Sequence, residues 1–178
     1  GAVYLMVAHG WMTALAFALI GFIYDQAHTR QLPEWGGLAK QLPFVATCTA
    51  IMAMASSGLP GFGNFVAELL IFVGAWEKYR WQTVAAVFGV VITATYLLRF
   101  VRSGFFGEAL SRWDELHDAA TPFQRLPFVA LIVALLIPTV TLVIGTYALP
   151  ILVGIFFLFH ILPAMTVWIV LSVVTFRL

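Results

Sequence analysis

The stretch SGLPGFG at residues 57–63 interrupts an apolar run that extends from residue 43 to residue 75. A helix needs about 20 apolar residues to cross a bilayer, so this run is longer than one span requires. Because glycine and proline break helices, we predict two half-helices joined by non-helical backbone. Such a break is tolerated at membrane depth only where it is buried in protein or lines a wet cavity. The predicted hinge residues are Gly58, Pro60, Gly61 and Gly63.

The composition of the whole chain indicates a membrane protein. Hydrophobic residues make up 62% and charged residues 10% of the 178 residues, and the mean hydropathy is +1.00. The apolar runs do not alternate with period two, as the strands of a membrane barrel would. The predicted fold class is therefore all-α: a polytopic transmembrane helix bundle with one broken helix. The candidate spans are residues 2–24, 43–75, 82–101, 127–148 and 150–176, and Pro127 stands where the fourth is expected to begin.

The basic residues lie mostly in the short connections between the apolar runs. If the first span ends at the connection 25–42, only Lys78 and Arg80 fall on one side of the membrane, and the other seven Lys and Arg residues fall on the opposite side. By the positive-inside rule, the richer side is cytoplasmic, and we expect an integral protein of the bacterial cytoplasmic (inner) membrane. The connection 102–126 has the pattern of a short amphipathic surface helix. The net charge of +1 gives no indication of nucleic acid binding.

The sequence predicts no catalytic, cofactor-binding or metal-ligating residue. A single cysteine, Cys48, cannot form a disulfide framework or hold an iron–sulfur cluster, and no nucleotide-binding fingerprint is present. His160 stands among aromatic residues, where packing or a place at the lipid interface is expected. Pro163 is expected to kink or tilt the last span. Electron transfer, if the parent assembly performs it, is expected in other subunits.

Glu68 is the most informative side chain, because it is the single carboxylate in an otherwise uncharged run of more than thirty residues. An ionised carboxylate in hydrocarbon costs roughly 2.5 to 3.5 kcal/mol on insertion scales, so such a group usually belongs to an ion path or has a buried partner. The half-helix break lies within about two turns of it. Two interpretations remain open: a proton relay group, or a static carboxyl group held by packing.

His9 is the second candidate relay group, since imidazole titrates closest to neutrality. A lone histidine on an apolar helix is more often a packed core residue, so this alternative also remains open. Thr13 lies one turn further along the same face and is expected to support a hydrogen-bonded path. Asn64, one turn before Glu68, is the other predicted supporting residue.

Four motifs in order resemble a known family. They are AHG at 8–10, HTR at 28–30, GGL at 36–38 and GLPGFGNFVAE at 58–68, and together they resemble the later half of the antiporter-like subunits of NADH-quinone oxidoreductase, respiratory complex I. The similarity extends over about residues 1–145. Related subunits and Mrp cation/proton antiporters usually carry lysine at the position of Glu68, so Glu68 selects one subunit type of the family.

The resemblance implies a proton-translocating subunit in an inverted-repeat antiporter-like fold. His9 matches the histidine of the family's central hydrophilic axis, and Glu68 matches the acidic group on its broken helix. The implied partners are other membrane subunits of a large hetero-oligomeric complex and the lipid bilayer. Quinone, NADH, flavin and iron–sulfur clusters are expected in the partner subunits and none in this chain. An Mrp-type or hydrogenase-linked cation/proton antiporter subunit and a non-conducting structural subunit remain alternatives.

The family's first inverted repeat is absent from this sequence, so we expect the chain to be the later part of a longer polypeptide. Residues 1–149 are predicted to form the later half of the antiporter-like domain. Residues 150–178 do not match the hydrophilic ending expected from the family, and they are predicted to form an additional hydrophobic helix.

Overall fold

The computed structural model describes residues 1–156, and over that range its regular structure is entirely helical. The α-helices are α1 (Ala2–Ala27), α2 (Pro43–Ser56), α3 (Gly63–Trp76), α4 (Arg80–Phe105) and α5 (Pro122–Phe156), and the short 3₁₀ helices are η1 (Leu32–Glu34), η2 (Leu38–Lys40) and η3 (Ser111–Trp113). The all-α prediction is confirmed for this part of the chain. The expectations for His160 and Pro163 lie outside the described residues.

The chain divides into two compact units, Gly1–Thr139 and Val140–Leu178. The first unit contains α1 to α4 and the start of α5. The described part of the second unit is the remainder of α5, which continues as helix past Pro150 to Phe156. The first seven residues of the predicted fifth span therefore continue α5 and do not start a new helix. The division of the chain at residues 149 and 150 stays a prediction.

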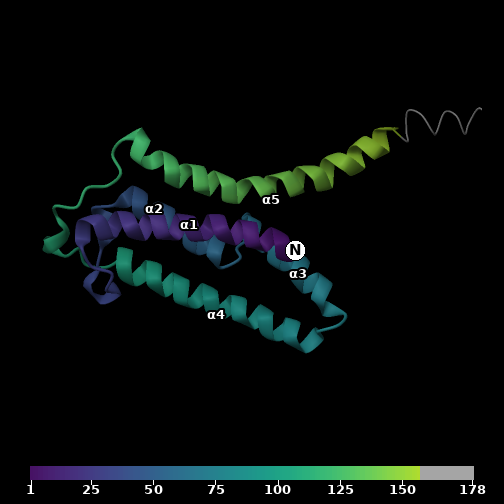
Figure 1. The fold of residues 1–178 in the computed structure, drawn as a ribbon, viewed down its shortest axis with the longest axis horizontal. Coiled ribbons are helices and arrows are strands. Elements are labelled where there is room, and N and C mark those ends of the chain that lie inside the picture. Colours follow the sequence, from purple (N-terminus) through teal and green to yellow (C-terminus); the bar gives the residue numbers. More distant parts are fainter. Residues whose placement is uncertain (157–178) are drawn as a thin grey trace, which may run out of the picture. The chain divides into compact units, whose positions relative to one another are not determined.

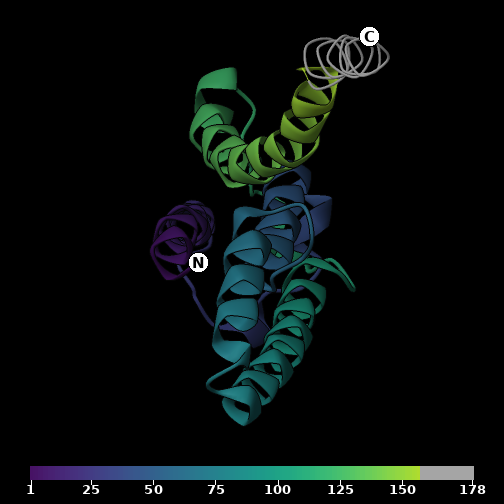
Figure 2. The same cartoon turned by 90° about the vertical axis from the view of Figure 1, so that its right-hand side faces the viewer.

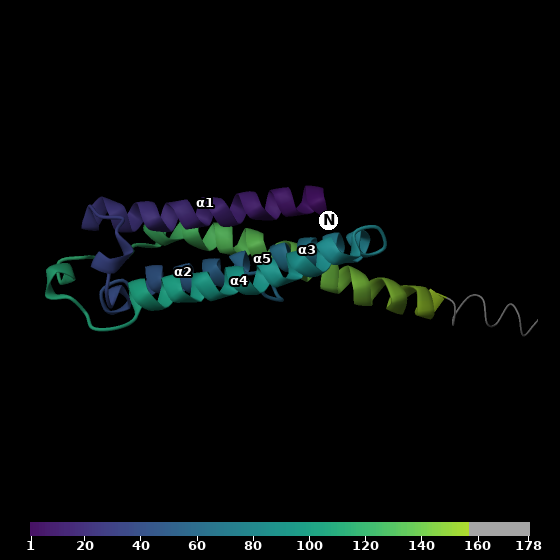
Figure 3. The same ribbon diagram turned by 90° about the horizontal axis from the view of Figure 1, so that it is seen from below.

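The predicted broken helix is present. The half-helices α2 and α3 have 14 residues each, which at 1.5 Å per residue is about 21 Å, too short for a hydrocarbon core of about 30 Å. They follow one another along α1 and α4 (Figures 1 and 3) and share packing contacts with both. Viewed along the bundle, the broken helix lies between α1 and α4 (Figure 2). Three other described segments are long and apolar enough to span a membrane: α1, α4 and the part of α5 from Pro122 to Thr141.

One stripe of α1 carries all of its buried residues. Its members are spaced three or four residues apart, as expected for one face of a helix. They are Ala8, Met12, Leu15, Leu19 and Ile23. This stripe joins a core to which the connection 28–42, α2, the end of α4 and the start of α5 also contribute. The largest fully buried side chain is Phe105, at the end of α4.

The start of α5 lies five residues before the predicted one. Thr121 precedes the helix, its hydroxyl accepts a hydrogen bond from the Gln124 amide (3.3 Å), and the Gln124 side chain accepts one from the Thr121 amide (3.2 Å). This reciprocal pair is a capping box. Pro122 occupies the first helical position, where a missing N–H is harmless, and Pro127 lies inside the helix. The prediction placed Pro127 at the first helical position, which Pro122 occupies in the structure.

The predicted surface helix in the connection 102–126 is wrong. Helix α4 continues to Phe105, α5 begins at Pro122, and the only regular element between them is η3. This segment, called the connecting loop (residues 106–121), is fixed by hydrogen bonds to the α1–α2 region. Gln26 exchanges two hydrogen bonds with the backbone of His117, and Gln41 donates one to Asp114. The side chains of Arg112 and Trp113 donate to the Glu34 carbonyl.

Candidate functional site

The helix break begins with a hydrogen-bonded cap on α2. Gly58 has a φ of 67°, in the left-handed region that glycine adopts without steric cost. Its amide donates to the Ala55 carbonyl (3.3 Å), and the Leu59 amide donates to the Met54 carbonyl (3.1 Å). These two bonds form a Schellman motif, which satisfies carbonyl groups that would otherwise be exposed at membrane depth. The backbone then passes Gly61, with a φ of 117°, and enters α3 at Gly63.

The Glu68 carboxyl group folds back onto this break. A Cβ atom on Gly58 would lie 3.3 Å from the Glu68 Cδ and closer still to its Oε2. Only a glycine at position 58 leaves room for the carboxyl group in this position. The hinge predicted from the glycine and proline pattern therefore has a second role, since it seats the acid that the sequence singled out.

A cleft of about 260 Å³ adjoins the Glu68 side chain between three helices. Its lining residues come from the end of α2, from α3 and from the middle of α4. They are Ser56, Glu68, Phe72, Ala86, Gly89, Val90 and Thr93. Since a water molecule occupies about 30 Å³ in the liquid, the cleft has room for several waters. The Thr93 hydroxyl donates to the Gly89 carbonyl (3.0 Å), so its oxygen can still accept a hydrogen bond from a water.

The sequence reasoning missed Ser56 and the whole α4 wall of this cleft. A signal was present in α4, because Ala86, Gly89, Val90 and Thr93 follow the spacing i, i+3, i+4 and i+7 of one helix face. Small residues on one face of a membrane helix allow another helix to approach closely. This face of α4 carries no charged residue, so the sequence reasoning did not assign it to a proton site.

His9 lies on α1 and is exposed in this chain, and Thr13 is half-buried on the same helix. The neighbouring Ala8 packs toward α3, with its Cβ 3.5 Å from the Cβ position of Gly63. Glu68 instead lines the cleft whose opposite wall is formed by α4. The structure therefore does not bring His9 into the cleft with Glu68.

Asn64 is 2% exposed, in the first turn of α3. Its Oδ1 and the Tyr4 hydroxyl are buried without a hydrogen-bond partner among the residues that the structure describes. The Tyr4 hydroxyl lies 3.2 Å from the Cβ position of Gly63, at the contact between α1 and α3. Because buried polar atoms nearly always have a partner, both atoms are suited to bind water beside the break.

Within residues 1–156, no group of three or more His, Cys, Asp or Glu side chains is placed to hold a metal ion. Cys48 is a buried free thiol in α2. The chemistry that the described groups offer is proton binding and release, at one carboxyl group beside a polar cleft.

Several relatives can be aligned with most of this chain. The chain is 32% identical over 147 residues to NADH-quinone oxidoreductase subunit M of Rhodobacter capsulatus, covering 83% of this chain and 28% of the relative. It is 34% identical to the subunit M of Escherichia coli K12, covering 85% and 29%. It is 39% identical to NAD(P)H-quinone oxidoreductase chain 4 1 of Synechococcus elongatus, covering 83% and 28%. The chain thus spans less than a third of the length of these relatives.

Structural similarity leads to the same group of proteins. A chain of respiratory complex I from Thermus thermophilus with bound NADH matches with a TM-score of 0.70 and 32% identity, over 77% of this chain and 28% of that chain. The bacterial relatives and the apolar helices agree with the predicted location, an integral protein of the bacterial cytoplasmic membrane.

A family model described as NADH:quinone oxidoreductase/Mrp antiporter, TM matches residues 1–93, which is just over half of the 178 residues. The matched segment contains α1, the helix break, Glu68 and the first half of α4. The resemblance inferred from the four sequence motifs is confirmed, and the chain belongs to the NADH:quinone oxidoreductase/Mrp antiporter transmembrane family.

Proposed function

We propose that this chain is the later part of a proton-translocating membrane subunit of a complex I-type NADH-quinone oxidoreductase. The observation that carries the proposal is the Glu68 carboxyl group, seated on a broken helix beside a cleft large enough for several waters. A broken helix at the ion site is a recurrent feature of secondary transporters. In this proposal Glu68 binds and releases the transported proton.

The free energy needed to move one proton against the membrane potential is of the same order as a pKa change at a single carboxyl group. Moving one charge against 100 mV costs about 2.3 kcal/mol. A change of about two units in the pKa of one carboxyl group corresponds to about 2.7 kcal/mol. One charge that moves or changes near Glu68 is therefore sufficient in scale to load or unload it.

His9 is the proposed second relay group, on the α1 side of the broken helix. Protons would pass between His9 and Glu68 along waters at the break, with Thr13 and Asn64 as supporting groups. The unpartnered Asn64 Oδ1 supports this route, because it offers a buried water site in the first turn of α3. The protons would leave toward the membrane side that carries Lys78 and Arg80.

The redox chemistry would take place in other subunits of the complex. We propose that this chain carries no redox centre and that quinone, NADH, flavin and iron–sulfur clusters are bound by its partners. Their reactions would change the charge near the relay groups, and the chain would contribute the proton path alone.

Replacing Glu68 tests the relay directly. In the intact assembly, Glu68→Gln is expected to lower proton pumping into vesicles during NADH oxidation by more than about tenfold, because removal of a proton-transfer group usually costs at least that much. Assembly, measured by co-purification of the other subunits, is expected to be retained. The matched control is Glu77→Gln, an exposed carboxylate just after α3, which is expected to pump normally.

The same experiment separates the alternatives. Normal pumping by Glu68→Gln would refute the relay role of Glu68. If Glu68→Gln and His9→Gln together changed only stability, the chain would be a structural subunit. The family also contains Mrp antiporters by its description, and a dependence of transport on sodium would favour a cation/proton antiporter.

A further inference from the structure

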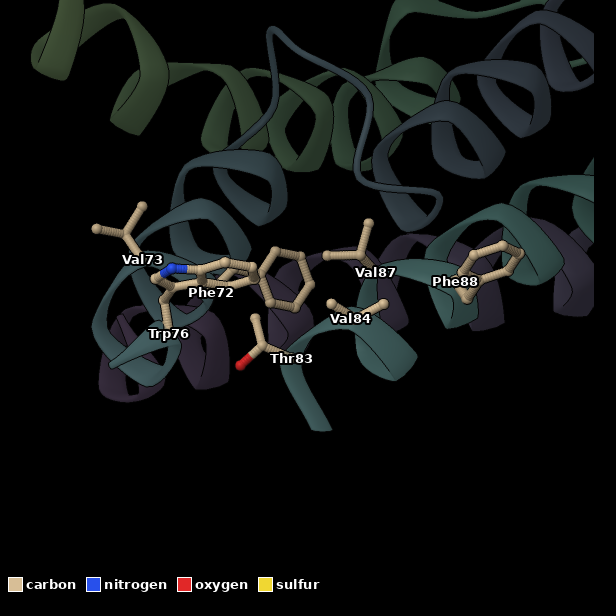
Figure 4. Close-up of a pocket in the computed structure, with 7 residues that line it drawn as sticks. All are labelled: Phe72, Val73, Trp76, Thr83, Val84, Val87 and Phe88. Carbon is tan, nitrogen blue, oxygen red and sulfur yellow. The ribbon is translucent and has the colours of Figure 1, made fainter. Parts of the chain in front are cut away.

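A second, larger hollow lies between α3 and α4, nearer the turn that joins them. Its volume is about 410 Å³, and its side chains are shown in Figure 4. They include Phe72, Val73 and Trp76 from α3 and Thr83, Val84 and Phe88 from α4. This hollow is called the α3–α4 groove below.

The α3–α4 groove presents only apolar surface. Its one hydroxyl, on Thr83, donates to the Tyr79 carbonyl (2.9 Å), so no side-chain hydroxyl remains without a partner in the wall. Val73 is 67% exposed and Phe88 is 69% exposed. Both belong to membrane helices, so this apolar surface is available to lipid. The occupant that this surface fits is a hydrocarbon chain.

The end of the groove near the turn carries positive charge and interfacial aromatic side chains. The Arg80 guanidinium lies 5.5 Å from the centre of the Trp76 ring, which itself lines the groove, and the Lys78 ammonium lies 5.5 Å from the Tyr79 ring. Trp and Tyr side chains gather at the level of the lipid headgroups. Glu77 is the one acidic residue in this turn, so the two cations outnumber it.

The spacing between the charged residues and the groove matches the spacing between the phosphate and the acyl chain of a phospholipid. Thr83 lies three residues after Arg80 in α4, about 4.5 Å along the helix axis, and Phe88 lies about 7.5 Å further. A phosphate held at Arg80 would therefore place the first part of an acyl chain along the groove. We propose that the α3–α4 groove binds one acyl chain of an anionic phospholipid, whose phosphate is held by Arg80 and Lys78.

The bound chain has a consequence for the neighbouring cleft. Phe72 lines both the α3–α4 groove and the Glu68 cleft, so its ring forms a wall that the two share. An acyl chain on the groove side supports this ring and keeps water out of the groove. The lipid thus closes one side of the Glu68 cleft.

Photolabelling of the intact assembly tests the lipid site. The assembly is reconstituted in bilayers that contain phosphatidylglycerol or phosphatidylcholine with a diazirine in the acyl chain, and the label is mapped by mass spectrometry. Phosphatidylglycerol is expected to label residues 72–88 about fivefold more than phosphatidylcholine, the preference expected for the net charge of +1 that Lys78, Arg80 and Glu77 carry together. Lys78→Gln with Arg80→Gln is expected to remove this preference. Lys40→Gln, an exposed lysine in η2, is the matched control and is expected to keep it.

A variant that fills the groove provides the second arm. Val84→Trp is expected to lower the labelling of residues 72–88 by both lipids. Equal labelling of the unsubstituted protein by the two lipids would overturn the proposal, and so would the absence of label from residues 72–88. Val87 of α4 also lines the groove. A photoreactive side chain introduced at Val87 that crosslinks to another subunit would show that protein fills the groove, and this would also overturn the proposal.

Discussion

Gly58 and Glu68 are in close contact, although they lie ten positions apart in the sequence. The glycine permits the left-handed backbone that ends α2, and its missing side chain leaves room for the carboxyl group. A side chain at position 58 would therefore have two effects. The left-handed conformation costs roughly 1–2 kcal/mol for a residue with a Cβ, and the carboxyl group would have to move.

Gly58→Ala is expected to destabilise the protein by about 1–2 kcal/mol and to displace the Glu68 carboxyl group. Gly61→Ala is the matched control, since Gly61 also has a positive φ but has nothing within 4 Å of its Cβ position. The stability of both variants is measured by thermal denaturation. The reactivity of Glu68 is measured by its rate of modification with a hydrophobic carbodiimide.

Both variants are expected to lose stability, but only Gly58→Ala is expected to change the modification rate of Glu68. An equal change in both variants would show that backbone strain alters the reactivity of Glu68. The close approach of Gly58 to the carboxyl group would then have no special role.

Among the elements, those predicted correctly are marked by local sequence. The break between α2 and α3 follows from glycine and proline inside an apolar run. The isolation of Glu68 in the sequence marked it as a candidate site residue, and its relay role stays a prediction. The start of α5 was also marked locally, by Thr121 and Gln124, but Pro127 was a competing signal. The small-residue face of α4, including Thr93, was visible in the sequence, but its place beside Glu68 was not, because it depends on which helix faces the break.

The connecting loop shows why the segments between the helices could not be predicted from the sequence. Its charged residues suggested a surface helix, but Trp113, Leu116 and Ala119 are buried at intervals of three residues. Its backbone groups bond to Gln26, far away in the sequence. Such long-range hydrogen bonds satisfy backbone groups that a helix would otherwise pair, and no local pattern reveals them.

Asp118 links the connecting loop to the broken helix. Its carboxylate accepts hydrogen bonds from the amides of Phe44 (2.6 Å) and Val45 (3.3 Å), in the first turn of α2. Arg125 braces the same region, with its guanidinium 4.9 Å from the centre of the Phe44 ring and a hydrogen bond to the Ala119 carbonyl (2.5 Å). The N-cap residue of α2, Leu42, makes no side-chain cap hydrogen bond. The Asp118 carboxylate, more than 70 residues later in the chain, takes over this capping function.

Asp118→Ala is expected to cost about 1 kcal/mol, the usual value for loss of an N-cap, and to loosen the connecting loop. The measurement is hydrogen–deuterium exchange of residues 106–121 in the intact assembly, where about 1 kcal/mol corresponds to roughly fivefold faster exchange. Asp118→Asn is expected to keep most of the protection, because asparagine caps helices nearly as well as aspartate. Asp114→Ala removes an exposed hydrogen bond to Gln41 and is the control. Equal exchange in Asp118→Ala and Asp114→Ala would contradict the cap.

At the scale of the whole bundle, the structure places the basic residues at the two ends as the sequence predicted. The connection 28–42 and the connecting loop lie at the same end, since their residues share hydrogen bonds. The turn that carries Lys78 joins α3 to α4 at the other end, a full span of α4 away (Figure 1). Six of the described basic residues lie on or near the first end: Arg30, Lys40, Arg99, Arg102, Arg112 and Arg125.

This arrangement predicts the orientation in the membrane. By the positive-inside rule, the connecting loop faces the cytoplasm and the α3–α4 turn faces the opposite side. Two variants test this, Lys78→Cys and Glu115→Cys, since both positions are exposed and the native Cys48 is 2% exposed. A membrane-impermeant maleimide is expected to label Lys78→Cys in right-side-out vesicles and Glu115→Cys only in inverted vesicles. The unsubstituted protein, with Cys48 alone among the described residues, is expected to stay unlabelled in both. The reverse pattern would place the exit side of the proposed proton path in the cytoplasm, and the direction of transport through Glu68 would have to be inverted with it.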